Sequence, residues 1–208
     1  MPYKINLAPW DRKEHFQFFR RFEEPFFGVC VEVDCTVAYS RAKELDTSFF
    51  LYYLHKSIMA VNQTEPFCYR IVGDDVIVYD HVGASATINR PNGTFGFSYI
   101  PYAEDFREFE KLAQDEIERI RITSGLEPAT ASEGVIHYSS LPWIKFTSVS
   151  HARSFSHADS IPKISFGKMT ETDGKRTMPV SVHVHHALMD GFHVSQHLEL
   201  FQELLNQT

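Results

Sequence analysis

Histidines concentrate near the end of this 208-residue sequence, between residues 182 and 197. The stretch VHVHHALMDGFHVSQH holds five histidines, one aspartate and one glycine between an alternating apolar run and a helix-like run. An imidazole with one fixed tautomer can take up a proton near neutral pH, so a histidine here could act as a general base. Burying so many polar groups within an apolar segment costs desolvation free energy, so we expect this cluster to have a functional role.

Strand periodicity distinguishes the histidines from one another. Residues 180–186 alternate, with three valines and His186 on one face and His183 and His185 on the other. We therefore expect His186 to extend an apolar row towards the interior at the end of a strand. Asp190 follows where the strand gives way to a helix, where it can cap that helix or pair with a cation from elsewhere in the chain.

Two alternatives to a general base stay open for the histidines of this cluster. An ordinary core or surface position is the common role for a single histidine, and it applies to His183, His193 and His197. A metal site is the second alternative, because His193 and His197 are four residues apart on the expected helix, as zinc ligands often are. No third ligand is fixed by the spacing, so no metal is expected.

Composition narrows the classes of function. The net charge of −7 leaves no basic face for phosphate backbones, so nucleic acid is not an expected partner. Cys30, Cys35 and Cys68 are odd in number and have no C-x-x-C spacing, so neither disulfides nor a cysteine zinc site is expected. No signal-peptide pattern or membrane-spanning run is present, which makes a cytoplasmic protein the expectation.

The scaffold is expected to be one domain over residues 1–208, because nothing repeats and no linker divides the chain. Strands dominate the pattern, together with three sizeable helices. This favours an α+β fold, a two-layer α/β sandwich in which helices cover a large mixed β-sheet. Helices are predicted within residues 7–22, 41–63, 103–122 and 190–206, and strands at 26–37, 69–80 (a hairpin), 85–89, 94–99, 135–138, 144–148, 163–169 and 177–185.

Four motifs, in order, resemble those of the chloramphenicol acetyltransferase family. HHALMDGFH resembles its H-H-x-x-x-D-G signature, and WDRKEHF at residues 10–16 resembles W-x-R-x-x-H-F. SSLPW at 139–143 resembles S-x-L-P-W, and ISFGK at 164–168 resembles a strand that bears a hydroxyl and a lysine. A lone HxxxDG would be weak, since lipoyl-linked acyltransferases and peptide-synthetase condensation domains share it. The ordered set spans residues 7–205.

The resemblance implies an O-acetyltransferase that moves the acetyl group of acetyl-CoA to a hydroxyl of chloramphenicol or a similar small acceptor. His186 would be the general base of a direct ternary-complex mechanism, and Ser139 would stabilise the oxyanion. Asp190 and Arg12 would pair and hold the histidine loop in shape. An antibiotic-resistance activity in the cytoplasm would follow.

The resemblance also implies a homotrimer with active sites at subunit interfaces and with no metal. The residues that would bind the acceptor are Phe19, Cys30, Phe95 and Ser165, and those that would bind acetyl-CoA are Lys168 and Trp143.

Four positions depart from the family pattern, and one of them is Gly96, where some members carry a serine. Phe19 stands where chloramphenicol-modifying members carry a tyrosine, Ser165 replaces a threonine, and Met169 replaces an aromatic residue. The catalytic residues are intact, whereas the departures fall in the substrate pockets. Acetyl transfer is therefore better supported than the identity of chloramphenicol as the acceptor.

Four rival functions remain. The same chemistry on a different hydroxyl compound is one, and a non-catalytic trimeric binding protein with this fold is another. Acyl transfer to a dihydrolipoyl group is the third, and it is disfavoured because no lipoyl domain or Ala/Pro linker precedes the motifs. A metal-binding protein is the fourth, and stoichiometric zinc after purification would reveal it.

Overall fold

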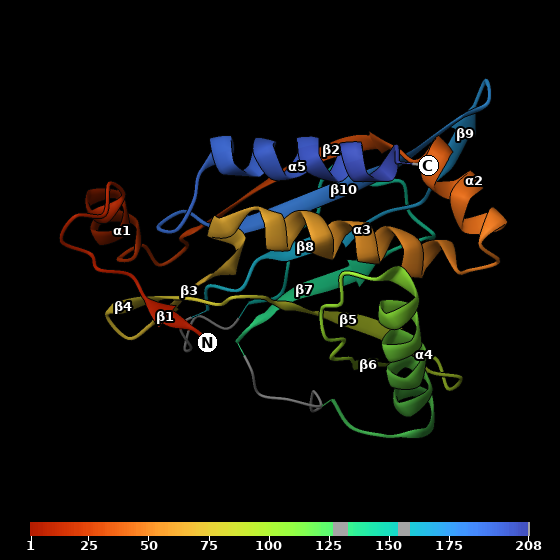
Figure 1. Ribbon diagram of the computed structural model, residues 1–208, viewed down its shortest axis with the longest axis horizontal. Helices are drawn as coiled ribbons and strands as arrows, with labels where there is room; N and C mark the ends of the chain where they lie inside the picture. Colours follow the sequence, from red (N-terminus) through yellow and green to blue (C-terminus); the bar gives the residue numbers. More distant parts are fainter. Residues whose placement is uncertain (127–132, 154–158, 208) are drawn as a thin grey trace.

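A mixed β-sheet crosses the molecule, with helices α3 and α5 lying side by side over one face (Figure 1). The computed structural model describes residues 1–126, 133–153 and 159–207. The helices are α1 (Lys13–Phe19), α2 (Thr36–Glu44), α3 (Phe49–Gln63), α4 (Phe106–Ile122) and α5 (Gly191–Leu205), with a short 3-10 helix, η1 (Glu65–Cys68). The strands are β1 (Tyr3–Lys4), β2 (Phe26–Asp34), β3 (Tyr69–Val72), β4 (Asp75–Val78), β5 (Gly83–Asn89), β6 (Phe95–Phe97), β7 (Val135–Ser140), β8 (Lys163–Phe166), β9 (Thr170–Thr172) and β10 (Lys175–His185).

The large sheet has the strand order β2-β10-β8-β7-β5-β6, and β9 pairs with β10. β7 runs parallel to both β5 and β8, whereas β10 is antiparallel to β2 and β8. A smaller sheet has the order β1-β4-β3. The predicted α+β fold with a large mixed sheet is confirmed.

One face of the large sheet forms the core beneath the helices. Val180, Val182 and Val184 of β10 are at most 1% exposed. Phe166 of β8 lies opposite Val180 and contacts rings of both helices, with centroid distances of 4.6 Å to Tyr53 of α3 and 6.0 Å to Phe201 of α5. Burial of this apolar face is the main favourable term for the layered fold.

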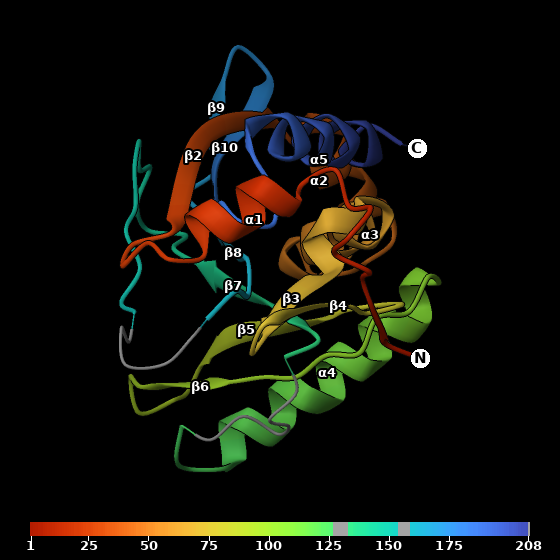
Figure 2. The same ribbon diagram turned by 90° about the vertical axis from the view of Figure 1, so that its left-hand side faces the viewer.

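The other face of the same strands is polar. Because side chains alternate along a strand, the residues between the core positions point away from the helices. They form two cross-strand rows: Ser139, Ser165, Ser181 and Cys30, and next to it His137, Lys163, His183 and Gly28. The segment that follows β7 runs on this side of the sheet, away from α3 and α5 (Figure 2).

Two predicted elements are interrupted. The helix expected over residues 41–63 is two helices, α2 and α3, because Asp46 takes a left-handed conformation with φ of 50° and ends the first one. The strand expected over 26–37 ends at Asp34, since its carboxylate accepts the backbone N–H of Thr36 and starts α2.

The strand expected at residues 144–148 is wrong. The chain turns at Pro142 and Trp143, with the N–H of Ile144 bonded to the carbonyl of Leu141, and residues 144–148 that follow form no strand. The strand expected over 163–169 ends at Phe166, because Lys168 bonds to Ile144 rather than to β10, and β9 follows separately. The remaining expected elements are confirmed within a few residues at each end. In the described part of the chain, every helix is too short or too polar to cross a membrane.

A buried arginine joins the two sheets. Arg70 of β3 is fully buried, and its guanidinium donates hydrogen bonds to the carbonyl oxygens of Phe67, Tyr69, Glu133 and Val135. Those carbonyls lie just before or at the start of β3 and of β7, so one side chain ties the small sheet to the large one.

Replacing this arginine should destabilise the fold strongly. Arg70→Met would leave several buried carbonyl groups without donors, so we expect the free energy of unfolding to fall by about 3 kcal/mol or more. Arg41→Met, which removes an exposed ion pair with Glu44, should change it by less than about 1 kcal/mol. Urea unfolding of the two variants checks this, and equal losses would contradict it.

Candidate active site

His186 lies in the turn directly after β10, which corrects its predicted place on the strand. The last strand residue is His185, which is 5% exposed, whereas His186 is half-buried. The alternation stops because the carbonyl of His185 accepts the N–H of Leu188 and closes a turn. The N–H of His186 bonds to the carbonyl of Pro25, just before β2.

Two phenylalanine rings and one carbonyl hold the imidazole. Phe19 of α1 stacks on it with a centroid distance of 3.9 Å and an angle of 17°, and Phe27 of β2 lies at 4.7 Å. Nδ1 of His186 is 3.2 Å from the carbonyl oxygen of Met189. Because a carbonyl only accepts hydrogen bonds, Nδ1 carries the proton and Nε2 has a free lone pair in the neutral ring.

The ion pair that the resemblance implies is present. Nη1 of Arg12 donates to Oδ2 of Asp190 at 2.5 Å, and Nη2 donates to the carbonyl oxygen of His186 at 3.3 Å. Oδ1 of Asp190 also accepts the N–H of Phe192, and it lies 2.9 Å from Nδ1 of His193. The aspartate therefore both caps α5 and pairs with a distant cation, so it ties the first helix to the histidine turn.

The charge state of Asp190 follows from these contacts. Burial raises the pKa of its carboxyl group, but the hydrogen bond from Arg12 and the nearby His193 outweigh burial and lower the pKa from 3.8 to about 2. A lowered pKa means that the ionised form stabilises the folded state above pH 4, and that this stabilisation is lost as the pH falls towards 2.

We expect Asp190→Asn to lower the free energy of unfolding at pH 7 by about 1–2 kcal/mol, allowing for partial solvent screening. The difference from the unmodified protein should shrink as the pH is lowered from 4 to 2. Asp75→Asn, which removes an exposed pair with Lys4, is the matched control and should have little effect at any pH. Chemical denaturation across this pH range checks the prediction, and a difference independent of pH would contradict it.

A second group of predicted residues lies on the polar face of the sheet. Ser139 and Phe95 line a cavity of about 580 Å³, together with side chains from β5, β7 and the segment after β7. Ser165 lies opposite Ser139 in the neighbouring strand and is fully buried, and its Oγ has no hydrogen-bond partner among the described residues. Cys30 of β2 follows in the same row, opposite Ser181.

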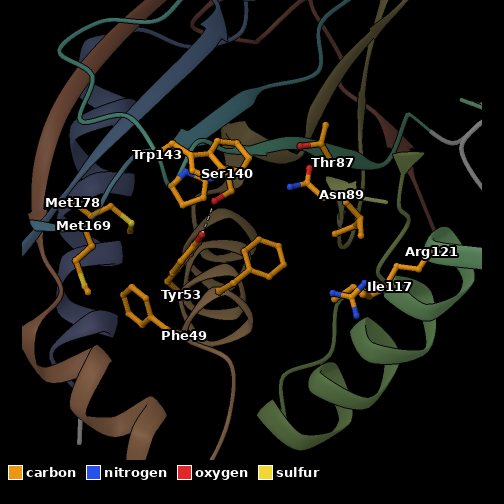
Figure 3. Close-up of a pocket in the computed structure, with 14 residues that line it drawn as sticks. Phe49, Tyr53, Thr87, Asn89, Ile117, Arg121, Ser140, Trp143, Met169 and Met178 are labelled. Carbon is orange, nitrogen blue, oxygen red and sulfur yellow. Dashed lines mark hydrogen bonds between the residues drawn. The ribbon is translucent and has the colours of Figure 1, made fainter. Parts of the chain in front are cut away.

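A third group surrounds a cavity of about 350 Å³ between α3, α4 and the ends of the strands (Figure 3). Trp143 lines it and is 67% exposed, and Tyr53 donates to or accepts from Ser140 at 3.0 Å. Arg121 reaches this cavity from α4. Lys168 is exposed, and its neighbours Gly167 and Met169 both line the cavity.

The two cavities adjoin at the ends of β5 and β7. Thr87 lines both of them, and the consecutive residues Ser139 and Ser140 line one each. A substrate in one cavity and a substrate in the other could therefore meet next to Ser139.

Within one chain, His186 and Ser139 are far apart. Ser139, Ser165 and Ser181 lie opposite one another on neighbouring strands, and His186 is five residues beyond Ser181. With about 3.3 Å per residue along a strand and about 4.8 Å between strands, the separation is roughly 19 Å. His186, Phe19, Arg12 and Asp190 thus form one group, and Ser139, Phe95 and Ser165 form another.

The histidines that suggested a metal site have separate environments. His197 is fully buried between the rings of Phe67 and Phe201, whereas His193 contacts Asp190. Among the described residues, no three histidine, cysteine, aspartate or glutamate side chains are arranged to hold a metal ion.

Comparison with known proteins identifies the family. The family model for chloramphenicol acetyltransferase matches residues 1–202. The chain belongs to this family. It is 31% identical to chloramphenicol acetyltransferase 3 of Escherichia coli, over 98% of this chain and 96% of that protein. A chloramphenicol acetyltransferase of Bacillus pumilus is 30% identical over 93% of this chain and 89% of its own length.

Solved structures agree with this assignment. A chloramphenicol acetyltransferase structure superposes with a TM-score of 0.90 and 31% identity, covering 99% of this chain and all of that one. The truncated catalytic core of a 2-oxoacid dehydrogenase multienzyme complex from Thermoplasma acidophilum reaches a TM-score of 0.70 at 15% identity, over 93% and 92% of the two chains, and shares the fold. The expectation of a chloramphenicol acetyltransferase-type acyltransferase is confirmed.

In this chloramphenicol acetyltransferase family member, several residues that line the cavities were not predicted as site residues from the sequence. Tyr53, Ser140 and Arg121 come to the smaller cavity from separate elements, so no short-range spacing could connect them. Lys163 and His137 of the larger cavity could have been noticed, because they alternate with Ser165 and Ser139 in their strands.

Proposed function

We propose that this chain is an O-acetyltransferase that transfers the acetyl group of acetyl-CoA to the hydroxyl of a small acceptor, with chloramphenicol as the first compound to test. The observation that carries the proposal is the fixed tautomer of His186. Its Nδ1 is bound to the carbonyl of Met189, so Nε2 is the atom able to receive a proton.

The mechanism is direct transfer in a ternary complex. Nε2 of His186 removes the proton of the acceptor hydroxyl as the oxygen attacks the thioester carbonyl. The hydroxyl of Ser139 donates to the resulting oxyanion. The intermediate then collapses, the carbon–sulfur bond breaks, and the imidazolium returns its proton to the CoA sulfur. Holding both substrates together supplies the effective concentration that makes a covalent acyl-enzyme unnecessary.

The two adjoining cavities divide the substrates between them. The smaller cavity suits acetyl-CoA, because its aromatic and methionine walls can pack against the pantetheine arm, while Arg121 and Lys168 supply positive charge for the phosphates. Trp143 would lie along this route. The larger cavity, with Phe95 and Ser139, would hold the acceptor, and Ser165 lies buried beside Ser139.

The active site requires two copies of the chain. His186 and Ser139 are roughly 19 Å apart along the sheet, too far for both to act on one carbonyl group. A homotrimer in which His186 of one chain faces Ser139 of the next would bring them together, with Phe19 entering beside His186.

The role of His186 is tested by thiol release from acetyl-CoA, with and without chloramphenicol. His186→Ala should lower kcat/KM by about 10²–10⁴-fold, the usual value of a positioned general base. His81→Ala, at an exposed position outside both cavities, should leave the rate unchanged. Near-normal turnover by His186→Ala would refute the assignment.

Shared sites predict complementation between inactive variants. In randomly mixed oligomers of His186→Ala and Ser139→Ala chains, about a quarter of the interfaces should join an intact His186 to an intact Ser139. Co-expressed and purified together, these chains should recover up to about a quarter of the normal activity, far above either parent.

The matched control pairs His186→Ala with the double variant His186→Ala/Ser139→Ala, which has no intact histidine and should recover nothing. Mixed oligomers no more active than their parents would indicate that each site is built within one chain.

A further inference from the structure

Tyr53 and Ser140 form a polar pair in the wall of the smaller cavity. The hydroxyl group of Tyr53 in α3 lies 3.0 Å from that of Ser140, the last residue of β7, and both residues line the cavity (Figure 3). Their immediate surroundings are apolar, because Phe49, Phe50 and Trp143 line the same cavity. A hydrogen-bonded pair of hydroxyl groups in such surroundings can orient a polar group of a bound ligand.

The ring of Tyr53 is held in one place. Its centroid lies 4.6 Å from that of Phe166, 5.1 Å from that of Phe49 and 5.7 Å from that of Phe50, and Tyr53 is 5% exposed. Burial raises the pKa of Tyr53 to about 12, so its hydroxyl group keeps its proton near neutral pH. Tyr53 therefore presents a fixed, protonated hydroxyl group to Ser140.

The pair has a preferred direction of hydrogen bonding. A phenol is more acidic than an aliphatic alcohol, so the hydroxyl group of Tyr53 donates and Oγ of Ser140 accepts. The hydroxyl group of Ser140 still carries a proton of its own, and among the described residues it has no other hydrogen-bond partner. Because Ser140 is half-buried and lines the cavity, this proton can reach a ligand there. Accepting a hydrogen bond from Tyr53 also makes Ser140 a stronger donor.

Ser140 lies on the path that a thioester would take to Ser139. The two serines are consecutive, so their Cα atoms are about 3.8 Å apart and their side chains point to opposite faces of the sheet. In the proposed mechanism, acetyl-CoA fills the smaller cavity and its carbonyl group reaches Ser139, so the pantetheine arm passes Ser140. This arm has an amide group two methylene groups from the sulfur. The carbonyl oxygen of that amide accepts hydrogen bonds and suits the free proton of Ser140.

A second serine–tyrosine pair joins the same two elements away from the smaller cavity. The hydroxyl groups of Ser57 in α3 and Tyr138 in β7 are 3.1 Å apart. Ser57 is fully buried and lines neither cavity. This pair contributes to packing between α3 and β7, whereas the pair of Tyr53 and Ser140 opens onto a space that a ligand can fill.

We propose that Ser140 donates a hydrogen bond to the pantetheine arm of acetyl-CoA, at the amide carbonyl nearest the sulfur, and that Tyr53 is the positioning residue that directs this donor. The inference rests on the proposed function, because it assigns further residues to the same acetyl-CoA site. The amide is remote from the bonds that change, so the contact contributes to binding and not to the chemical step.

Isothermal titration calorimetry of CoA with the full-length protein measures this contact without turnover. Ser140→Ala should weaken CoA binding about fivefold, the usual value of one hydrogen bond. Tyr53→Phe leaves Ser140 in place but frees its hydroxyl group to rotate, so CoA binding should weaken about threefold. The double variant should lose no more affinity than Ser140→Ala alone, because Tyr53 acts through Ser140.

Ser57→Ala is the matched control. It removes a serine hydroxyl bonded to a tyrosine between the same two elements, so it should lower the free energy of unfolding at least as much as Ser140→Ala does. Its CoA affinity should nevertheless stay within about twofold of that of the unmodified protein. Adenosine 3′,5′-bisphosphate, the part of CoA without the arm, should bind the Ser140→Ala variant and the unmodified protein with affinities within about twofold of each other.

Acetyl transfer supplies a second readout. An interaction made equally in the ground state and in the transition state changes KM and not kcat. Ser140→Ala and Tyr53→Phe should therefore raise the KM for acetyl-CoA and leave kcat and the KM for the acceptor unchanged. A general distortion of the site would lower kcat instead.

An unchanged CoA affinity in Ser140→Ala, an equal loss in Ser57→Ala, losses that add in the double variant, or an equal loss for the bisphosphate would overturn the inference. The two proposals fail separately. CoA binding that weakens as expected in a protein that acetylates no acceptor would refute the proposed function alone. Acetyl transfer together with an unchanged CoA affinity in Ser140→Ala would refute the inference alone.

Discussion

Side-chain alternation along β10 is the constraint on which the rest of the structure depends. Val180, Val182 and Val184 must be buried under the helices, so the residues between them must face the other side of the sheet. Pairing carries the same alternation into β8 and β7, where Lys163, Ser165, His137 and Ser139 follow it. A slip of one residue would exchange the two faces and place these polar groups in the core.

The orientation of His186 is set by the turn at the end of β10 and not by strand alternation. A strand holds side chains in two directions only, whereas the turn after His185 lets His186 lie between Phe19 and Phe27. Ala187, Leu188 and Met189 of this turn are fully buried. The ion pair of Arg12 with Asp190, and the bond from Arg12 to the carbonyl of His186, attach it to the start of the chain. The geometry around His186 therefore depends on residues from opposite ends of the sequence.

Much of the fold could be predicted, because burial and periodicity act locally. The helix after Asp190 and the hairpin before β5 follow directly from the spacing of their apolar residues and from their caps or turns. The failures have local causes that periodicity does not contain. Asp46 adopts a left-handed conformation within an apparently continuous helix, and the run after Trp143 follows a turn and bonds through the carbonyl of Ile144 to the N–H of Lys168.

The sequence by itself determined the family, the candidate residues and the two-faced character of the strands, since motifs and alternation are properties of neighbouring residues. Only the tertiary structure decided which candidates lie together. It separated His186 from Ser139 by the width of two strand spacings and five residues of β10, and it gathered Arg153, Asp159 and Lys163 around a cavity with His151. The physical reason is that strand register and the path of the segment between β7 and β8 set distances between residues that are remote in sequence, and no local pattern encodes those distances.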